Sequence, residues 1–303
     1  MKFKNKTVFA ISRIVLVVVS FFQFFFLEAQ EFNDDVAFLR AVEKAADSLV
    51  VRTKTISMEK AQQVLNSHSV RIDLNLPKPS RKMLTSRELF ERAKSSTVIV
   101  ATAYLCPRCS NTHISTSSGY VVDAKGIVVT NYHVVASYAF MTDGNKPVGF
   151  MVRASNGRMY AVKSILTASK RDDLAILELE TGGGDTFTAL PLAEKAQVGD
   201  QVYVMGHPKG MHYFFSQGYV NHKYIDEAGA PNDSFKRNVM AISADYATGS
   251  SGGPVMDQYG NIVGTVSNTR TLMHSDMNPS VQMVIKNTIP VESLRQLIVN
   301  PEK

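Results

Sequence analysis

The sequence has little of what defines several classes of protein. Among 303 residues it has no tryptophan, only two cysteines, and moderate numbers of glycine (18) and proline (11), while 45% of its residues are hydrophobic and 20% are charged. This composition argues against a collagen, a coiled coil or a wholly disordered chain. It leaves one large globular domain or two modest ones, with enough residues to build a core.

The chain also has little net charge once its first thirty residues are set apart. The formal net charge is +6, and half of it comes from Lys2, Lys4, Lys6 and Arg13 opposed by Glu28, so the remainder carries only +3. A charge this small gives no electrostatic reason to expect nucleic acid or an anionic membrane as a partner.

Only one long hydrophobic run is present, and it lies near the N-terminus. Basic residues precede it, residues 14–27 are almost all apolar, and Ala29 follows. This order is typical of a secretory signal peptide cut beside the small residue. The run has 14 residues, fewer than the roughly 20 that a membrane-spanning helix needs, which disfavours the alternative of an uncleaved anchor. We predict a signal peptide at residues 1–30, export to the periplasm or the medium, and no membrane association after cleavage.

Residues 31–84 are expected to form a helical N-terminal extension. Ser57 can cap a short helix that runs to about Asn66, and Pro77 and Pro79 favour an extended linker after it. The extension either packs beside the main domain or serves as a removable, inhibitory pro-segment. An earlier helix over residues 34–49 is indicated by apolar residues at helical spacing, namely Val36, Phe38, Leu39, Val42, Ala45, Ala46 and Leu49.

Residues 85–303 have the pattern of an all-β domain. Thr85 and Glu88 have the spacing of a capping box for a helix that ends near Ser95, and residues 290–299 predict a C-terminal amphipathic helix. Between them, many short β-rich runs separated by glycine-containing turns favour a barrel or a sandwich. The runs form two groups of about six, divided by residues 190–199: residues 97–105, 119–122, 127–130, 148–154, 159–166 and 174–179, then 201–206, 213–220, 239–243, 254–256, 262–267 and 281–285.

The sharpest local signal for chemistry is the stretch Gly249-Ser250-Ser251-Gly252-Gly253-Pro254. Glycines around a serine allow a substrate carbonyl to approach and leave backbone N–H groups free to face a developing oxyanion. Because a serine hydroxyl is hardly ionised at neutral pH, it needs a base, usually a histidine that a carboxylate orients. His133, at the end of an expected strand, and Asp173, at the start of another, are the candidates.

Three segments resemble the signature blocks of the chymotrypsin-like serine peptidases, in particular the bacterial HtrA/Deg branch. They are SGYVVDAKGIVVTNYHVV at residues 118–135, DLAIL at residues 173–177 and GSSGGPV at residues 249–255. The order His, Asp, Ser matches, with spacings of 40 and 78 residues. The resemblance covers roughly residues 95–300.

The resemblance implies a double six-stranded antiparallel β-barrel with the active site in the cleft between the barrels. It implies that His133 is the general base, Asp173 its orienting carboxylate and Ser251 the nucleophile, and that the N–H groups of Gly249 and Ser251 form the oxyanion hole. The expected activity is that of a serine endopeptidase acting on proteins or peptides through an acyl-enzyme, without metal or organic cofactor. The alternative is a catalytically silent scaffold that binds proteins or peptides in the same cleft.

Two departures from the family pattern bear on regulation. Ser250 stands where the pancreatic branch has an aspartate, so no buried carboxylate is available there for a newly freed N-terminal amine. We therefore expect no activation of the trypsinogen type. No PDZ module follows the barrel pattern, so we expect no regulation through one. The sequence predicts no oligomeric state.

By the same resemblance, the strand at Ser267, Asn268 and Thr269 should pair with the substrate backbone. Asp245 lies six residues before Ser251, where trypsin-like enzymes carry the carboxylate of the specificity pocket. A buried carboxylate there would favour Lys or Arg at the cleaved bond. The alternative is a structural aspartate that braces the turn at residues 245–248, and the sequence leaves the choice open.

The two cysteines, Cys106 and Cys109, are separated by two residues, and His113 follows. In an exported chain they are expected to form a local disulfide. A zinc site at these three residues would lack an evident fourth ligand, and free thiols are the remaining alternative. A redox or zinc protein centred on this pair is a third, weaker hypothesis for the function.

Overall fold

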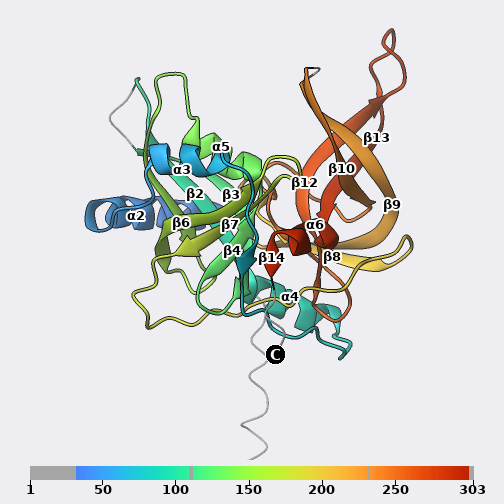
Figure 1. Ribbon diagram of the computed structural model, residues 1–303, viewed down its shortest axis with the longest axis horizontal. Helices are drawn as coiled ribbons and strands as arrows, with labels where there is room; N and C mark the ends of the chain where they lie inside the picture. Colours follow the sequence, from blue (N-terminus) through green and yellow to red (C-terminus); the bar gives the residue numbers. More distant parts are fainter. Residues whose placement is uncertain (1–31, 109–111, 231, 300–303) are drawn as a thin grey trace, which may run out of the picture. The chain divides into compact units, whose positions relative to one another are not determined.

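The computed structural model describes residues 32–108, 112–230 and 232–299. The expected signal peptide and Cys109 lie outside these residues. From Asp35 onward the chain forms one compact unit that contains two closed, six-stranded, antiparallel barrels (Figure 1). The predicted all-β, double-barrel fold is confirmed.

The first barrel has the strand order β2-β3-β4-β7-β6-β5 and the second β10-β13-β12-β11-β8-β9. Of the twelve expected strands, five have the expected bounds, and β3, β9, β10, β12 and β13 are much longer. The bounds in the first barrel are β2 Thr97–Leu105, β3 Thr112–Asp123, β4 Ile127–Thr130, β5 Lys146–Arg153, β6 Met159–Ser169 and β7 Leu174–Leu179. Those in the second are β8 Gln201–Gly206, β9 Phe214–Ala230, β10 Asp233–Ile242, β11 Pro254–Met256, β12 Ile262–Met273 and β13 Val281–Pro290.

Each barrel encloses its own core of β-branched and large apolar side chains. Val98, Val100 and Phe150 are at most 1% exposed in the first barrel, as are Val204 and Val255 in the second. Between the barrels lies a further cluster of buried residues, which includes Tyr120, Val122, Val129, Leu174, Ile176, Tyr203, Met205, Met256 and Ile262. Burial of such a side chain stabilises the fold by about 1.5–3 kcal/mol, so this cluster fixes the two barrels against each other and thereby the cleft between them.

The N-terminal extension is part of the folded core. It contains α2 (Asp35–Arg52), α3 (Met58–Leu65) and the short strand β1 (Ile72–Asp73). Three residues of α2, Val42, Ala46 and Leu49, are buried, and so are Ala61 and Leu65 of α3. The Ser57 side chain caps α3 by accepting a hydrogen bond from the N–H of Lys60.

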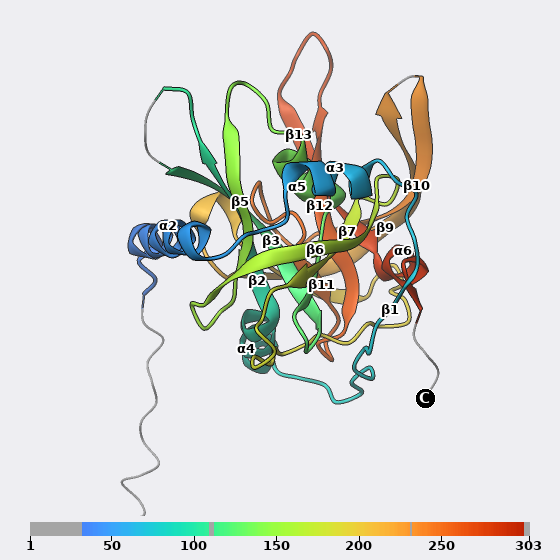
Figure 2. The same cartoon turned by 60° about the vertical axis from the view of Figure 1, so that its left-hand side comes forward.

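The helix α5 (Tyr132–Ala139) follows β4 and was not expected from the sequence. It packs against α3, as Figure 2 shows near the top of the first barrel. The hydroxyl of Tyr132 donates to the carbonyl of Leu65, and that of Tyr138 donates to the carbonyl of Ile56. The extension therefore supports the helix that carries His133.

The helix α4 (Ser86–Ser96) begins with the predicted capping box: the Thr85 side chain accepts from the N–H of Glu88, and the Glu88 side chain accepts from the N–H of Thr85. The C-terminal helix is shorter than predicted. Only Val291–Gln296 is helical (α6), and Ile298–Val299 forms the strand β14, which pairs in parallel with β1. The prediction failed there because Leu297, Ile298 and Val299 form a short continuous apolar run, which periodicity alone assigns neither to a helix nor to a strand.

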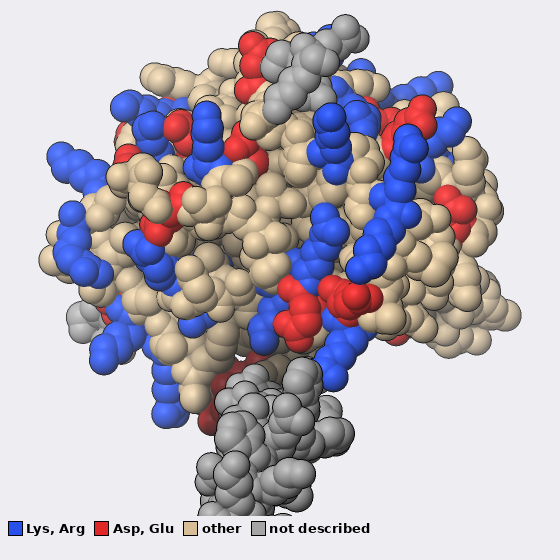
Figure 3. Space-filling view, turned by 90° about the horizontal axis from the view of Figure 1, so that it is seen from below, with Lys and Arg blue, Asp and Glu red and all other residues tan. Residues whose placement is uncertain are grey.

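Two hairpins of the second barrel, β9–β10 and β12–β13, extend well beyond the barrel wall (Figure 1). Their outer parts carry exposed apolar side chains such as Ile225, Met277 and Met283. On the face seen in Figure 3, Lys and Arg side chains lie scattered among uncharged residues and a few acidic ones. Within the described residues, no helix combines the length and the apolar character needed to cross a membrane.

Candidate active site

His133 and Asp173 lie next to each other at one end of the first barrel. His133 is the second residue of α5 rather than the end of a strand, and Asp173 directly precedes β7. The imidazole Nδ1 of His133 lies 3.0 Å from both Asp173 Oδ1 and Asp173 Oδ2, and the backbone N–H of His133 donates to Oδ1 at 3.1 Å. A carboxylate in this position accepts a hydrogen bond from Nδ1–H and so leaves Nε2 of the neutral ring unprotonated and free to act as a base.

The local backbone fixes the Asp173 carboxylate in place. Asp173 adopts a left-handed conformation with φ 50°, which aspartate tolerates better than most residues. Its carbonyl oxygen accepts a hydrogen bond from the Asn131 side chain at 2.8 Å, and its Oδ2 accepts one from the hydroxyl of Ser267 at 2.6 Å. The side chain of Asp173 is 9% exposed, whereas that of His133 is 47% exposed. The imidazole therefore faces the cleft while its carboxylate partner is shielded from water.

Ser251 lies in a tight turn of the second barrel that is anchored to the first. Its carbonyl oxygen accepts from the N–H of Ser118 on β3 at 2.9 Å, and its hydroxyl donates to the carbonyl of Ser267 at 3.2 Å. Gly252 has φ +84°, and a Cβ there would lie only 2.3 Å from the Ser118 carbonyl oxygen. The sequence therefore needs glycine after the serine for the two barrels to approach this closely.

His133 and Ser251 line one pocket of about 350 Å³. Residues 246–248 of the turn before Ser251 and residues 266–269 of β12 form the rest of its lining. The structure thus brings His133, Asp173, Ser251, Ser267, Asn268 and Thr269 together, and their roles in catalysis and substrate binding stay a prediction. No Asp, Glu, Lys or Arg side chain lines this pocket.

The peptide group between Thr248 and Gly249 is held in a defined orientation. The Thr248 carbonyl accepts from the N–H of Lys209 at 2.8 Å. Because C=O and N–H lie on opposite sides of a trans peptide, the N–H of Gly249 points away from Lys209. The Gly249 carbonyl is held in turn by the Ser118 hydroxyl at 2.9 Å. Both N–H groups that the resemblance assigns to an oxyanion hole therefore belong to a turn that is anchored on both sides.

Gly249 itself cannot be replaced without moving this turn. It has φ +100°, a region that non-glycine residues rarely adopt, and a Cβ would lie 2.4 Å from the carbonyl oxygen of His207. The close contact between Gly249 and residues 207–209 was not predicted from the sequence. No local motif marks it, since the partners are forty residues apart in the chain.

Asp245 does not line the pocket, so of the two roles that the sequence left open for it, the buried specificity carboxylate does not match its position in the structure. Its side chain is 80% exposed, with Oδ1 3.7 Å from Nζ of Lys286. The same ammonium donates to the carbonyl of Tyr246. The lysine connects Asp245 to the adjacent backbone and so braces the turn, in line with the structural alternative. The Tyr246 hydroxyl, buried against β12 and β13, lies 2.7 Å from the carbonyl oxygen of Asn287 and 2.9 Å from that of Asn268, either of which can accept its one hydrogen. Burial raises the pKa of Tyr246.

Cys106 does not line this pocket. Cys106 is half-buried just after β2, and its expected disulfide partner is outside the described residues, so the disulfide stays a prediction. Across the described ranges, no group of three or more His, Cys, Asp or Glu side chains is arranged to hold a metal ion.

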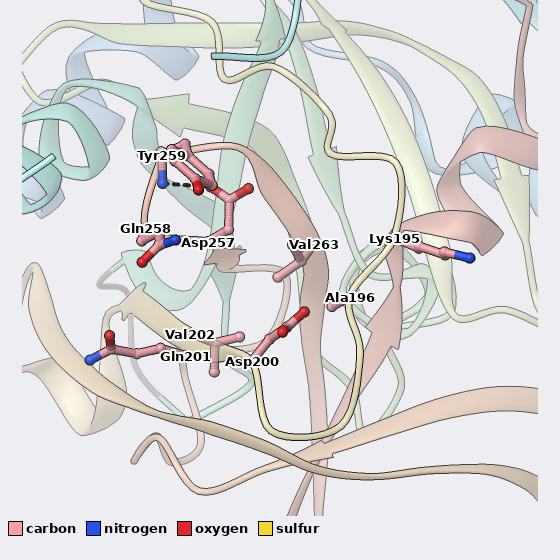
Figure 4. Close-up of a pocket in the computed structure, with 9 residues that line it drawn as sticks. All are labelled: Lys195, Ala196, Asp200, Gln201, Val202, Asp257, Gln258, Tyr259 and Val263. Carbon is pink, nitrogen blue, oxygen red and sulfur yellow. Dashed lines mark hydrogen bonds between the residues drawn. The ribbon is translucent and has the colours of Figure 1, made fainter. Parts of the chain in front are cut away.

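A second pocket, of about 320 Å³, opens on the second barrel (Figure 4). Its two carboxylates serve the local backbone: Asp257 accepts from the N–H of Tyr259 and of Asn261, both at 2.9 Å, and Asp200 accepts from the N–H of Gln197. Neither His133 nor Ser251 reaches it, so it offers no nucleophile–base pair.

Comparison with known proteins places these observations in a family. The family described as trypsin-like peptidase domain matches residues 117–264. Protease Do-like 5, chloroplastic, of Arabidopsis thaliana is 30% identical over 223 residues, which cover 70% of this chain and 68% of that protein. A probable periplasmic serine endoprotease, DegP-like, of Brucella suis is 29% identical over 186 residues, 61% of this chain but 33% of that protein. The chain thus spans only a third of the length of its DegP-like relative.

Two solved structures share the fold. The active form of the Rv3671c protease from M. tuberculosis aligns with a TM-score of 0.51 at 21% identity, over 77% of this chain and 92% of that one. Deg5 aligns with a TM-score of 0.51 at 23% identity, over 70% of this chain and 94% of that one. At these identities the likeness supports the fold alone.

Proposed function

The chain belongs to the family of trypsin-like serine peptidases that includes the Do-like proteases, and from that membership we propose that it is an exported endopeptidase that cleaves peptide bonds through Ser251, His133 and Asp173. Family membership makes it a serine protease and therefore a hydrolase. The assignment of the three residues, the acyl-enzyme and the export are the proposal. Residues 85–303 would form the catalytic domain and residues 31–84 its helical extension.

The observation that carries the proposal is the pairing of the His133 Nδ1 with both oxygens of Asp173 beside a pocket that Ser251 also lines. In the reaction, the Ser251 hydroxyl leaves the Ser267 carbonyl and donates to Nε2 of His133. Its oxygen then attacks the substrate carbonyl carbon as its proton passes to the imidazole. The Asp173 carboxylate keeps the imidazole in the required tautomer and stabilises the imidazolium that forms.

The negative charge of the tetrahedral intermediate would be met by the N–H groups of Gly249 and Ser251. Loss of one such donor typically lowers turnover by about 10²–10³-fold. When the intermediate collapses, His133 returns the proton to the leaving amine and the acyl group stays on Ser251. A water molecule, deprotonated by His133, then releases the acid and regenerates the hydroxyl.

Substrate would bind in extended form along β12. This strand pairs with β11 only as far as Thr265, whereas on its other edge it pairs with β13 from Gly264 to Met273. The edge from Ser267 to Thr269 beside the pocket is thus placed to add a substrate strand. Because the pocket is lined by uncharged side chains at residues 246–248 and 266–269, it would accept an uncharged side chain before the cleaved bond.

The proposal of export is supported by residues 1–30, in which basic residues precede an apolar run. It is also supported by the similarity to a probable periplasmic DegP-like protease. Sequencing of the N-terminus of the protein purified from its own cells would test it. A new N-terminus close to residue 30 supports export through a cleaved signal peptide, and an intact Met1 contradicts it.

The activity is tested by a fluorophosphonate probe, which labels activated serines, and by cleavage of a mixed peptide library. We expect a probe adduct on Ser251 by mass spectrometry and peptide cleavage by the wild type. Both should disappear in Ser251→Ala, and turnover should fall by about 10³-fold or more in His133→Ala.

The matched control is Ser250→Ala. Ser250 is the adjacent serine and is 1% exposed, so this variant should keep the label and the cleavage. If the wild type takes no label and cleaves no better than Ser251→Ala, the chain is a protein-binding scaffold and the proposal fails.

A further inference from the structure

The turn that carries the Gly249 N–H rests on one loop, residues 207–213 between β8 and β9. The N–H of Lys209 donates to the Thr248 carbonyl at 2.8 Å, and the His207 N–H donates at 3.1 Å to the Ser118 hydroxyl, which itself donates to the Gly249 carbonyl. The carbonyls on both sides of Gly249 thus depend on this loop. If the loop moves, the peptide that presents the Gly249 N–H is free to rotate.

The loop has a conformation that it would not keep without support. Lys209 has φ 49° and Tyr213 has φ 57°, left-handed values that are unfavourable for side chains of this size. Strained backbone of this kind persists only where its surroundings hold it. Inside the loop, the Tyr213 N–H donates to Nδ1 of the buried His207 at 3.1 Å. The Met211 N–H also donates to the Pro208 carbonyl at 2.9 Å, and further support comes from outside the loop.

That support comes from the first turn of α2, far away in the sequence. Asp35 Oδ1 accepts two hydrogen bonds from His212, one from its backbone N–H and one from its ring Nδ1, both at 3.0 Å. One turn further along α2, the ring centroids of Phe38 and His212 lie 4.0 Å apart. The guanidinium carbon of Arg153 lies 4.2 Å from the centroid of the Phe38 ring. The His212 side chain is only 3% exposed beneath this cover.

We propose that Asp35 is a positioning residue for the oxyanion hole: through His212 it holds the loop at residues 207–213, and the loop holds the Thr248–Gly249 peptide. The inference rests on the proposed function, since it assigns Asp35 a part in that same reaction. The N-terminal extension then does more than complete the core. Its first helix sets how well the enzyme stabilises the transition state, while the substrate-binding strand β12 lies outside this chain of contacts.

The test is the variant Asp35→Ala, compared with Asp35→Asn, whose side-chain oxygen can still accept both hydrogen bonds. Loss of both hydrogen bonds frees the loop and with it the Gly249 N–H, so we expect kcat for a peptide substrate to fall by about tenfold or more in Asp35→Ala. KM should change little. Asp35→Asn should stay within about threefold of the wild type. Asp47→Ala, an exposed aspartate on the same helix, should match the wild type.

Two further measurements separate positioning from general destabilisation. A peptide aldehyde, which forms a tetrahedral adduct with Ser251, should bind Asp35→Ala more weakly by the same factor as kcat falls. The parent peptide should bind equally well to Ser251→Ala with and without Asp35→Ala, since that binding needs no oxyanion hole. Should Asp35→Ala not fold, Asp35→Glu takes its place, because the longer side chain moves the carboxylate away from His212.

The inference is overturned if kcat is unchanged in the folded variant, if Asp35→Asn loses as much as Asp35→Ala, or if peptide binding and turnover fall together. Each of these outcomes requires that the wild type is active in the same assay. A wild type that does not turn over at all is a different result, because it removes the proposed function and this inference with it.

Discussion

The hydroxyl of Ser267 donates to Asp173 Oδ2 at 2.6 Å, while the carbonyl of the same residue accepts from the Ser251 hydroxyl at 3.2 Å. One residue of β12 thus contacts the candidate carboxylate and the candidate nucleophile at once. Asp173 belongs to the first barrel and Ser251 to the second, so Ser267 aligns two groups that separate barrels supply.

Replacement of Ser267 by alanine should lower kcat by about tenfold, because the Asp173 carboxylate loses a short hydrogen bond and is less firmly held against His133. Ser267→Thr keeps the hydroxyl and should recover most of the activity. Steady-state kinetics with one peptide substrate measures both. Equal rates for wild type and Ser267→Ala would show that the Ser267 hydroxyl is not needed to orient the carboxylate.

The residue before the cleaved bond should be uncharged. Profiling of cleavage sites on a mixed peptide library should show few Lys or Arg at that position, because no acidic side chain lines the pocket and a buried cation without a partner is strongly disfavoured. Asp245→Asn should leave the profile unchanged. A preference for basic residues that this variant abolishes would restore Asp245 as the specificity residue.

The fold should lose stability in mild acid. Burial, and after it the neighbouring His212, lowers the pKa of His207 to about 3, and burial also lowers the pKa of His212. Below pH about 6.5 the unfolded chain takes up a proton at His207 that the folded chain does not, so the free energy of unfolding falls as the pH decreases from 6.5 toward 3. The loss approaches about 1.4 kcal/mol per pH unit for one such histidine.

Urea unfolding between pH 4 and 8 measures this dependence. In His207→Asn the side-chain oxygen can still accept from the Tyr213 N–H, while the titrating group is gone. The number of protons that this variant takes up on unfolding should be smaller by about one, so its unfolding free energy should depend less steeply on pH. If wild type and variant have the same slope, other groups are responsible.

The extension should be indispensable for folding rather than removable. Leu65 on α3 is 6% exposed and packs in the same core cluster as Val134 and Tyr138 of α5. Leu65→Ala should therefore lower the free energy of unfolding by about 2–5 kcal/mol, whereas Lys60→Ala, on the exposed side of α3, should change it by less than about 0.5 kcal/mol. Urea unfolding compares the two. A cleaved enzyme that keeps full stability without residues 31–66 would instead support the pro-segment.

The strands of the barrels were predictable where apolar residues alternate with polar ones, or form a continuous run, between glycine-containing turns, as in β4 and β7. The outer parts of β9, β10, β12 and β13 were not, because both faces of a projecting hairpin meet solvent and the usual alternation disappears. The start of α5 was missed for another reason. Apolar residues such as Val134 and Val135 continue the pattern of β4, so the sequence alone gives no sign that the strand has ended.

The candidate triad followed from motif order, but its supports did not. The Ser267 hydroxyl, the Lys209 N–H and the Asp35 carboxylate act on partners 94, 39 and 177 residues away. Two of these three contacts involve backbone groups, which every residue has, so no residue type marks them. Asp245 shows the converse: position relative to Ser251 suggested a buried carboxylate, and the fold of the turn placed it in solvent.

The left-handed backbone at Asp173 also limits which amino acids position 173 accepts. Asparagine and glycine adopt this conformation readily, whereas alanine and the β-branched residues do not. A library of all substitutions at this position would therefore confound two effects, failure to fold and failure to orient the imidazole. Only asparagine changes the charge while respecting both the backbone and the size of the side chain, and it is the replacement whose residual rate can be interpreted.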